Sequence, residues 1–121
     1  MKVESYENLI AWQKSMDLVI AMYTLTGKFP KEEIYGLTSQ MRRAAVSIPS
    51  NIAEGSRRSS CKDFRNFLFN AYGSGAELET QIKIAKRLLY RENKDYEQVD
   101  VLLGEVMRML NKLTHELKIS E

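Results

Sequence analysis

The sequence has little of several residue types, and each shortage excludes a class of protein. One cysteine in 121 residues allows neither an intrachain disulfide nor a multi-cysteine zinc site. One histidine cannot supply the two Glu-x-x-His pairs of a di-iron helical bundle. The longest uninterrupted apolar run, residues 18–23, is far shorter than the roughly 20 residues that span a bilayer. Because residues 1–12 do not resemble a signal peptide, we expect a soluble protein of the reducing cytoplasm.

Catalytic motifs are also scarce. Neither Ser47 nor Ser50 lies in a Gly-x-Ser-x-Gly nucleophile elbow. The Gly-Ser-Gly of residues 73–75 lacks the downstream Lys-Ser/Thr of a phosphate-binding loop. His115 and Cys61 are widely separated in sequence, and we interpret them as a solvated side chain and an incidental boundary residue. The sequence therefore predicts a protein without enzymatic activity, metal or cofactor.

Apolar residues recur at steps of three and four, which is the period of amphipathic helices. This pattern predicts four helices, at about residues 8–27, 36–56, 60–91 and 94–118. Asn8 and Ser60 are the expected N-caps of the first and third helices, because their side chains accept hydrogen bonds from free N–H groups. Pro49 lies within the second helix, where we expect a kink instead of an end.

Four helices with short connections predict an all-α protein, a single antiparallel up-down four-helix bundle over residues 1–121. Its apolar stripes are wider than one bundle needs. Leu18, Met22 and Leu25, for example, form a second stripe on the first helix. Wide stripes indicate contacts between subunits, although they are also compatible with a thick core in one subunit.

A polar stripe accompanies the apolar ones. On the second helix it consists of Gln40, Arg43 or the adjacent Ala44, Ser47, Asn51 and Glu54. On the third helix it consists of Ser74, Glu77 and Gln81. Two such stripes would satisfy each other if they met, because buried polar groups require partners. We interpret them as a structural network; a pocket for a polar ligand and simple solvent exposure remain the alternatives.

The small net charge of +2 is unevenly distributed. Residues 42–65 carry six basic and two acidic side chains, a net charge of +4, whereas the flanking segments are each close to neutral. The basic side chains are Arg42, Arg43, Arg57, Arg58, Lys62 and Arg65. Such a segment is either solvated surface or a contact for phosphates. Arg57 and Arg58 are the strongest candidates for phosphate contacts, because they follow Gly55 in the expected link between two helices.

Several motifs resemble those of a known family. They are YGLTSQ at residues 35–40, RRAA at 42–45, SIPSNIAEG at 47–55, ELETQ at 77–81 and WQKxMDL at 12–18. The sequence resembles the bacterial four-helix-bundle family found in the intervening sequences of large-subunit ribosomal RNA genes. A relative of that family is the accessory protein of diversity-generating retroelements, a positively charged pentameric barrel that binds nucleic acid and a reverse transcriptase.

The resemblance implies a ring-shaped homopentamer of four-helix subunits. Fivefold repetition would raise the +4 of residues 42–65 to about +20, a charge suited to phosphate contacts. One hypothesis is therefore an assembly module that binds RNA or another nucleic acid through this segment. The alternative is a structural module that binds another protein and no nucleic acid. Neither hypothesis involves a membrane.

Overall fold

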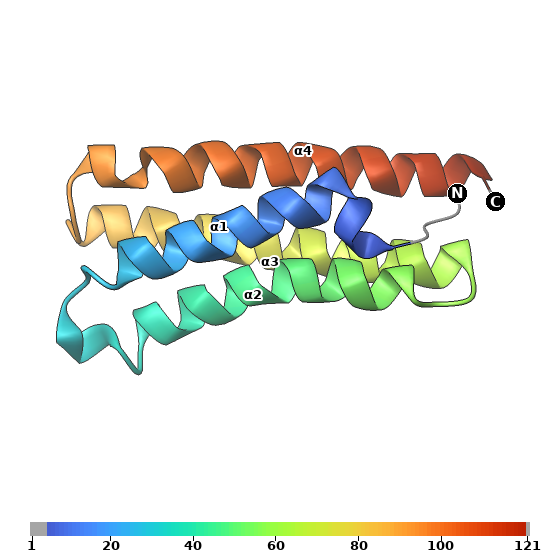
Figure 1. Cartoon of the computed structure of the whole chain (residues 1–121). Helices are drawn as coiled ribbons and strands as arrows, with labels where there is room; N and C mark the ends of the chain where they lie inside the picture. Colours follow the sequence, from blue (N-terminus) through green and yellow to red (C-terminus); the bar gives the residue numbers. More distant parts are fainter. Residues whose placement is uncertain (1–4, 121) are drawn as a thin grey trace.

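Four long α-helices run alternately in opposite directions and form a bundle (Figure 1). The computed structural model describes the backbone of residues 5–120 and the side chains of residues 5–117. The helices are α1 (Ile10–Thr26), α2 (Leu37–Ser56), α3 (Cys61–Arg87) and α4 (Glu97–Ser120). Residues 5–120 contain no strand, so the predicted all-α four-helix bundle is confirmed. The domain expected over residues 1–121 also includes residues 1–4 and 121, which lie outside the described residues.

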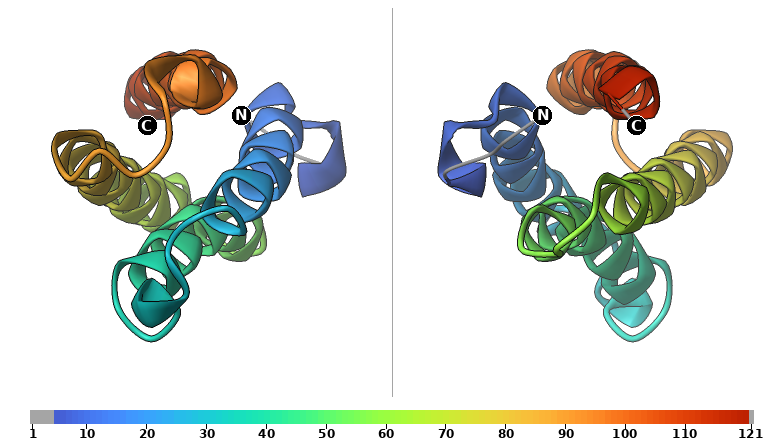
Figure 2. Two further views of the ribbon diagram at one scale, coloured as in Figure 1. Left: turned by 90° about the vertical axis from the view of Figure 1, so that its left-hand side faces the viewer. Right: turned by 90° about the vertical axis from the view of Figure 1, so that its right-hand side faces the viewer.

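The core lies along the bundle axis. Each helix packs against two neighbours, in the order α1, α2, α3, α4 and back to α1, as the end-on views show (Figure 2). All four helices bury apolar side chains in this core, among them Leu18, Met22, Met41, Ile48, Leu68, Leu78, Val106 and Leu110. Burying such side chains is the main favourable term in folding.

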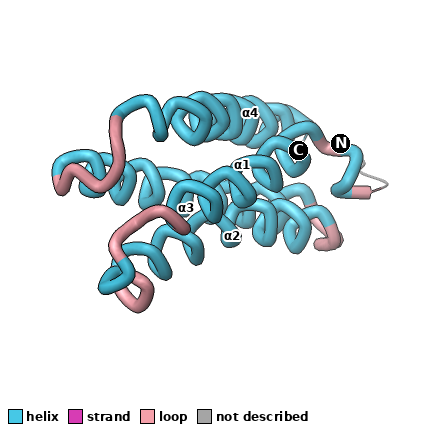
Figure 3. Tube along the Cα trace, turned by 60° about the vertical axis from the view of Figure 1, so that its left-hand side comes forward, coloured by secondary structure: helices cyan, strands magenta, loops and turns pink. Residues whose placement is uncertain are grey.

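The connections give the bundle two different ends (Figure 3). At the loop end, the α1–α2 connection contains the 3₁₀ turn Lys31–Glu33, and the α3–α4 connection contains the 3₁₀ turn Asn93–Tyr96. At the opposite end, which we call the terminal end, residues 57–60 join α2 to α3. The helix α1 begins there, preceded by the 3₁₀ turn Tyr6–Asn8, and α4 ends there.

One of the two expected N-caps is confirmed and the other is wrong. Ser60 caps α3, since its hydroxyl oxygen accepts from the N–H of Asp63 at 3.1 Å. Asn8 does not cap α1, because it is the last residue of a separate 3₁₀ turn. The residue before α1 is Leu9, whose extended backbone makes the transition without a side-chain hydrogen bond.

The second helix does not end at Pro49, and this part of the prediction is confirmed. A proline in a helix interior leaves the carbonyl four residues earlier without its usual donor. Around this weakened turn, side chains add bonds to the backbone: Ser50 Oγ donates to the Val46 carbonyl at 2.8 Å, and Asn51 Nδ2 donates to the Ser47 carbonyl at 2.8 Å. Pro49 itself is buried, so its ring contributes to the core.

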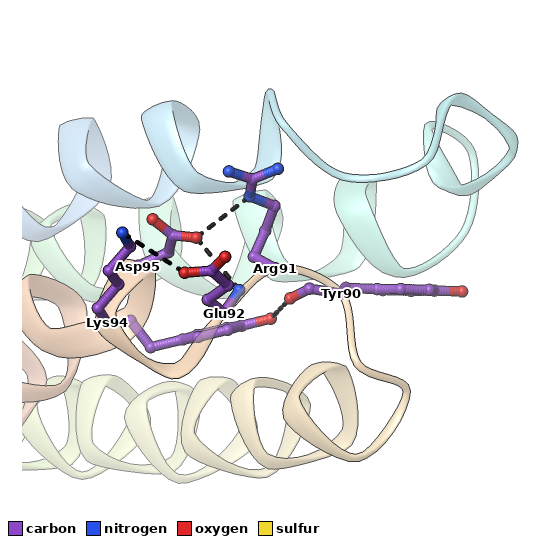
Figure 4. Close-up of polar contacts among 6 residues, drawn as sticks. Tyr90, Arg91, Glu92, Lys94 and Asp95 are labelled. Atoms are coloured by element: carbon purple, nitrogen blue, oxygen red, sulfur yellow. Dashed lines mark hydrogen bonds and ion pairs between the residues drawn. The ribbon is translucent and has the colours of Figure 1, made fainter.

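The α3–α4 connection is closed by polar contacts within a few residues (Figure 4). Asp95 accepts from the N–H of Glu92 at 3.2 Å and pairs with Arg91 at 3.3 Å. Lys94 pairs with Glu92 at 3.5 Å. The buried Tyr96 donates its hydroxyl to the carbonyl of Tyr90. These contacts fix where α4 starts relative to the end of α3.

Candidate nucleic-acid interface

The six basic side chains of residues 42–65 do not form one continuous surface. Arg42 and Arg43 lie in the second turn of α2, whereas Arg57 directly follows the last residue of that helix. At about 1.5 Å per helical residue, Arg42 and Arg57 are roughly 22 Å apart along the axis. The basic residues of this segment are therefore divided between two regions in space.

Arg42 is engaged by the end of α1. Its Nε donates to the Thr26 hydroxyl at 2.9 Å and its Nη2 to the Tyr23 carbonyl at 3.4 Å. The guanidinium carbon also lies 4.4 Å from the centre of the Tyr23 ring. A cation at a helix C-terminus satisfies free carbonyls and interacts favourably with the helix dipole. Arg42 thus joins α1 to α2 through two hydrogen bonds and a ring contact.

Arg43 points away from the core and is exposed. Within residues 5–117 it makes no hydrogen bond or ion pair with Glu54 or Glu77, the carboxylates to which its place on the polar stripe could tie it. It is a single cation on the outer face of α2, separated from the terminal end by several turns.

The other four basic side chains gather where α2 passes into α3. Arg57 and Arg58 occupy the link, and Lys62 and Arg65 lie in the first turns of α3. The structure exposes Arg57, Arg58 and Lys62 and leaves Arg65 half-buried. Three cations thus face solvent within a stretch of six residues, and a fourth lies one turn away along α3.

Aromatic rings hold two of these arginines in place. The guanidinium carbon of Arg57 lies 5.5 Å from the centre of the Tyr6 ring, and that of Arg58 lies 4.7 Å from the Phe67 ring. Arg58 also pairs with Glu54 at 2.8 Å. Because both partners of this pair are exposed, its contribution to stability is small, roughly 0–1 kcal/mol. Both arginines therefore remain able to exchange such contacts for those of an anionic ligand.

Three residues of the polar stripe meet between α2 and α3. The hydroxyls of Ser47 and Ser74 share a hydrogen bond across the two helices. Asn51 Nδ2 lies 2.8 Å from the Ser47 carbonyl and 3.3 Å from its hydroxyl. This cluster aligns the midpoints of α2 and α3, since a polar pair between packed helices favours one register.

The remaining stripe residues do not join that cluster. Gln40 is exposed, and Glu54 pairs with Arg58 on the surface. Gln81 Nε2 donates to Glu77 Oε2 at 3.3 Å along α3 itself. The side-chain oxygen of Gln81 is buried and has no hydrogen-bond partner in the described part of the chain. The stripe is thus divided into a cluster between helices, a pair within α3 and two surface positions.

Tyr6 is the residue at this interface that sequence patterns did not indicate. It precedes α1 and belongs to no helical stripe, so only the folding of the 3₁₀ turn back onto α2 brings it to Arg57. Across residues 5–120, no three His, Cys, Asp or Glu side chains gather closely enough to hold a metal ion. Within the same residues, no helix has both the length and the apolar character needed to cross a bilayer.

The fold and this surface define a small four-helix-bundle protein with four basic residues at one of its helix links. The chain belongs to the 23S rRNA-intervening sequence protein family, whose model matches residues 7–112. The resemblance that rests on the motifs of residues 12–18, 35–55 and 77–81 is thereby confirmed.

A solved structure shares the fold. It is a protein of unknown function from the S23 ribosomal protein family of Bacteroides thetaiotaomicron, with a TM-score of 0.80 and 23% sequence identity. The match covers 87% of this chain and 98% of that one. At this level of identity the similarity establishes the fold alone. No protein with a curated description matches the sequence.

Proposed function

We propose that this protein is a non-enzymatic, self-associating module of the cytoplasm that binds RNA through the terminal end of its bundle. The observation that carries the proposal is that Arg57, Arg58, Lys62 and Arg65 lie within nine residues at the α2–α3 link, three of them exposed. Phosphate contacts from lysine and arginine supply most of the affinity in sequence-independent binding. Arg42 is not part of this surface, because it lies near the opposite end of α2 and is held there by two hydrogen bonds to α1.

The arrangement of these cations suits a flexible phosphate chain. Planar guanidinium groups bind phosphates in a bidentate manner, and Arg57 and Arg58 are both presented beside aromatic rings. The carboxylates nearby, Glu54 and Asp63, are exposed, so solvent and salt screen their competition. The family description names ribosomal RNA, which favours RNA over DNA as the nucleic acid.

The proposed self-association uses the outer face formed by α1 and α2. Met16, Ile20 and Tyr23 recur at steps of four and three on α1, with 38%, 65% and 43% of their surface exposed. Arg42 contacts Tyr23, so antiparallel packing brings Val46, one turn further along α2, to about the level of Ile20. Contiguous exposed apolar side chains indicate a contact surface. The family resemblance implies five subunits, and light scattering on the wild-type protein would count them; a monomer would contradict this part of the proposal.

The test of RNA binding is anisotropy with a labelled single-stranded RNA at several salt concentrations. We expect log affinity to fall with log salt by about 0.7 for each phosphate contact. The double variant Arg57→Ala/Arg58→Ala should bind more weakly, with a slope smaller by about 1.4. A matched control is Lys83→Ala/Arg87→Ala, which removes two exposed cations from α3 outside the link.

Two outcomes would refute RNA binding at this surface. One is the absence of wild-type affinity at low salt. The other is an equal loss of affinity in the control and in the link variant, since binding would then depend on total charge and not on the terminal end.

A second candidate function is a protein-interaction module without RNA. It is favoured by a group of exposed apolar side chains at the loop end: Ile34, Tyr35, Leu88 and Leu89, with 52%, 94%, 50% and 84% of their surface exposed. The two connections that carry them are joined by a hydrogen bond from the Tyr90 hydroxyl to Glu33 at 2.7 Å. If the wild-type protein has no affinity for RNA, this surface becomes the leading candidate for function.

A further inference from the structure

A groove near the terminal end lies between the first half of α3 and the second half of α4. It has a volume of about 430 Å³ and is lined by Arg65, Phe69, Asn111, Thr114 and His115. Arg65 belongs to the cationic surface of the proposed function, whereas the other four residues were not among the candidates that the sequence indicated. The groove therefore extends the cationic surface onto a neighbouring face of the bundle.

The register of α3 and α4 produces this groove. Gly75 lies directly against Met107, since a Cβ at Gly75 would be 2.3 Å from the Met107 Sδ. The two helices are antiparallel. A residue six positions before Gly75 on α3 is therefore at the same level as a residue about six positions after Met107 on α4. Phe69 therefore faces the level of Asn111 and Thr114. Arg65 lies one turn from Phe69, as His115 lies one turn from Asn111.

Phe69 provides a stacking surface. It lies outside the buried stripe that contains Leu68 and Ala71, and 54% of its surface is exposed. An exposed aromatic ring beside an arginine is the combination that proteins use to hold a nucleobase and its phosphate. The volume of the groove is at the lower end of the range of small-molecule sites, which suits one nucleotide.

The polar residues of the groove offer hydrogen-bond donors and acceptors for a base and a positive charge for a phosphate. The Asn111 amide offers both donors and an acceptor, and His115 offers a ring nitrogen for either role. The Thr114 hydroxyl donates to the Leu110 carbonyl at 2.8 Å, so toward a ligand it acts as an acceptor. Arg65 supplies a guanidinium for the phosphate.

None of the described residues that line the groove is acidic. Three other grooves in the described part of the chain are each lined by at least one carboxylate: Glu116 in one, Glu79 and Asp100 in another, and Glu97 in the third. A nearby carboxylate would repel a phosphate. Among these four, the groove at Phe69 is the one whose charge is complementary to an anion.

We propose that this groove binds one nucleotide of a single-stranded RNA, with the base stacked on Phe69 and the phosphate at Arg65. The inference rests on the proposed function and specifies its ligand as an unpaired strand. In a duplex the bases are stacked on one another and their faces are covered, so only an unpaired nucleotide reaches the ring. The cations at the link then bind the phosphates that continue the strand.

The experiment compares an oligouridine of about 12 nucleotides with the same strand paired to oligoadenosine. Phe69→Ala should weaken binding of the single strand by about 5- to 150-fold and leave the duplex unchanged. Its salt slope should equal that of the wild type, because the ring neutralises no phosphate. Phe69→Tyr keeps the ring and should retain most of the affinity.

Tyr72→Ala is the matched control. Tyr72 is a similarly exposed aromatic residue one turn along α3, with 40% of its surface exposed, and it does not line the groove. The Tyr72→Ala variant should bind both RNAs with the affinity of the wild type. Uridine monophosphate should compete only at concentrations far above that of the strand, because it lacks the contacts at the link.

The outcomes separate this inference from the proposed function. If Phe69→Ala binds the single strand as the wild type does, or if Tyr72→Ala loses as much affinity, the groove is not the site and RNA binding at the link stands. If Phe69→Ala changes only the assembled mass in light scattering, the groove is a contact between subunits and the inference is overturned. If uridine monophosphate binds as tightly as the strand, the site binds free nucleotides and the inference that its ligand is an unpaired strand is overturned. If the wild type binds neither RNA, the proposed function fails and the inference fails with it.

Discussion

The two ends of the bundle use polar side chains in opposite ways. At the loop end they bind one another: Glu33 accepts from the Leu37 N–H at 3.0 Å and from the Tyr90 hydroxyl at 2.7 Å. At the terminal end, Arg57 and Arg58 contact aromatic faces and one exposed carboxylate. The loop end is thus held by hydrogen bonds between connections, and the terminal end presents charge to solvent. An arginine surrounded by hydrogen-bond acceptors of the protein stabilises the fold, whereas one with few such acceptors presents its charge to solvent.

Arginine shows this difference within one short segment. Arg42 faces the carbonyl and hydroxyl oxygens at the end of α1, and its side chain is half-buried. Arg57 lies beyond the end of α2, where its guanidinium contacts the Tyr6 ring. The same residue type therefore stabilises the fold in one place and remains available for a ligand in the other.

The largest expected effect is a disruption of the terminal end by Gly55→Ala. The added Cβ would lie 2.6 Å from the Phe67 Cβ and 3.0 Å from the Phe64 Cδ1. The Phe67 Cβ is attached to the backbone, so α3 itself must move to relieve the overlap. We expect the free energy of unfolding to fall by about 2–3 kcal/mol, measured by chemical denaturation, and RNA affinity to fall with it.

Gly73→Ala is the control for that substitution. A Cβ at Gly73 meets nothing within 4 Å, and alanine favours a helix interior more than glycine does. This variant should be as stable as the wild type or more stable, by up to about 1 kcal/mol. Equal stability of the two alanine variants would contradict the close packing of α2 on α3 at the terminal end.

A smaller effect should separate the two kinds of arginine. Arg42→Ala removes the bonds to Thr26 and Tyr23 and leaves the Thr26 hydroxyl oxygen without its donor, whereas the Tyr23 carbonyl still accepts from the Gly27 N–H at 3.0 Å. We expect it to lower the free energy of unfolding by about 1–2 kcal/mol. Arg43→Ala, at the next position, should change it by less than about 0.5 kcal/mol, because Arg43 is an exposed surface residue. If denaturation shows equal stabilities, Arg42 does not join α1 to α2 in the way described.

Much of the fold is predictable from the sequence because its signals are local. Each helix carries an apolar stripe over several turns, and the cap at Ser60 depends only on residues within the next turn. The start of α1 was less predictable, because the 3₁₀ turn Tyr6–Asn8 interrupts the chain just before it. The spacing of apolar residues does not show that residues 6–8 form a separate 3₁₀ turn and that α1 begins only at Ile10.

The candidate site was only partly predictable, because it depends on contacts between distant positions. The role of Arg42 follows from the end of α1 lying beside the second turn of α2, sixteen positions away from Thr26. The groove at Phe69 requires the register of α3 on α4, which the contact of Gly75 with Met107 sets. One signal for Phe69 was available: it is an aromatic residue outside the buried stripe of its helix.

The smallest expected effect concerns the bond between Tyr90 and Glu33 at the loop end. Bonds from the Leu37 N–H and the Tyr90 hydroxyl hold the pKa of Glu33 below its ordinary value of 4.5. A lowered pKa contributes stability above the unfolded-state value, and this contribution is lost as the pH falls through the folded-state value. The same bond raises the pKa of Tyr90 above 10.0, so its contribution is lost as the pH rises through that raised value.

Tyr90→Phe should therefore be less stable than the wild type by an amount that depends on pH. The difference in free energy of unfolding should be greatest between about pH 5 and pH 10 and should shrink at both extremes, because the bond joins a carboxylate to a neutral phenol. Tyr96 is an internal reference, since burial raises its pKa to about 12 and we expect the variant to keep this alkaline transition. Denaturation midpoints across the pH range test this expectation, and a difference that stays constant with pH would show that the hydroxyl contributes without coupling to Glu33. The loop end would then owe its rigidity to packing around Tyr96 and not to the bond between its two connections.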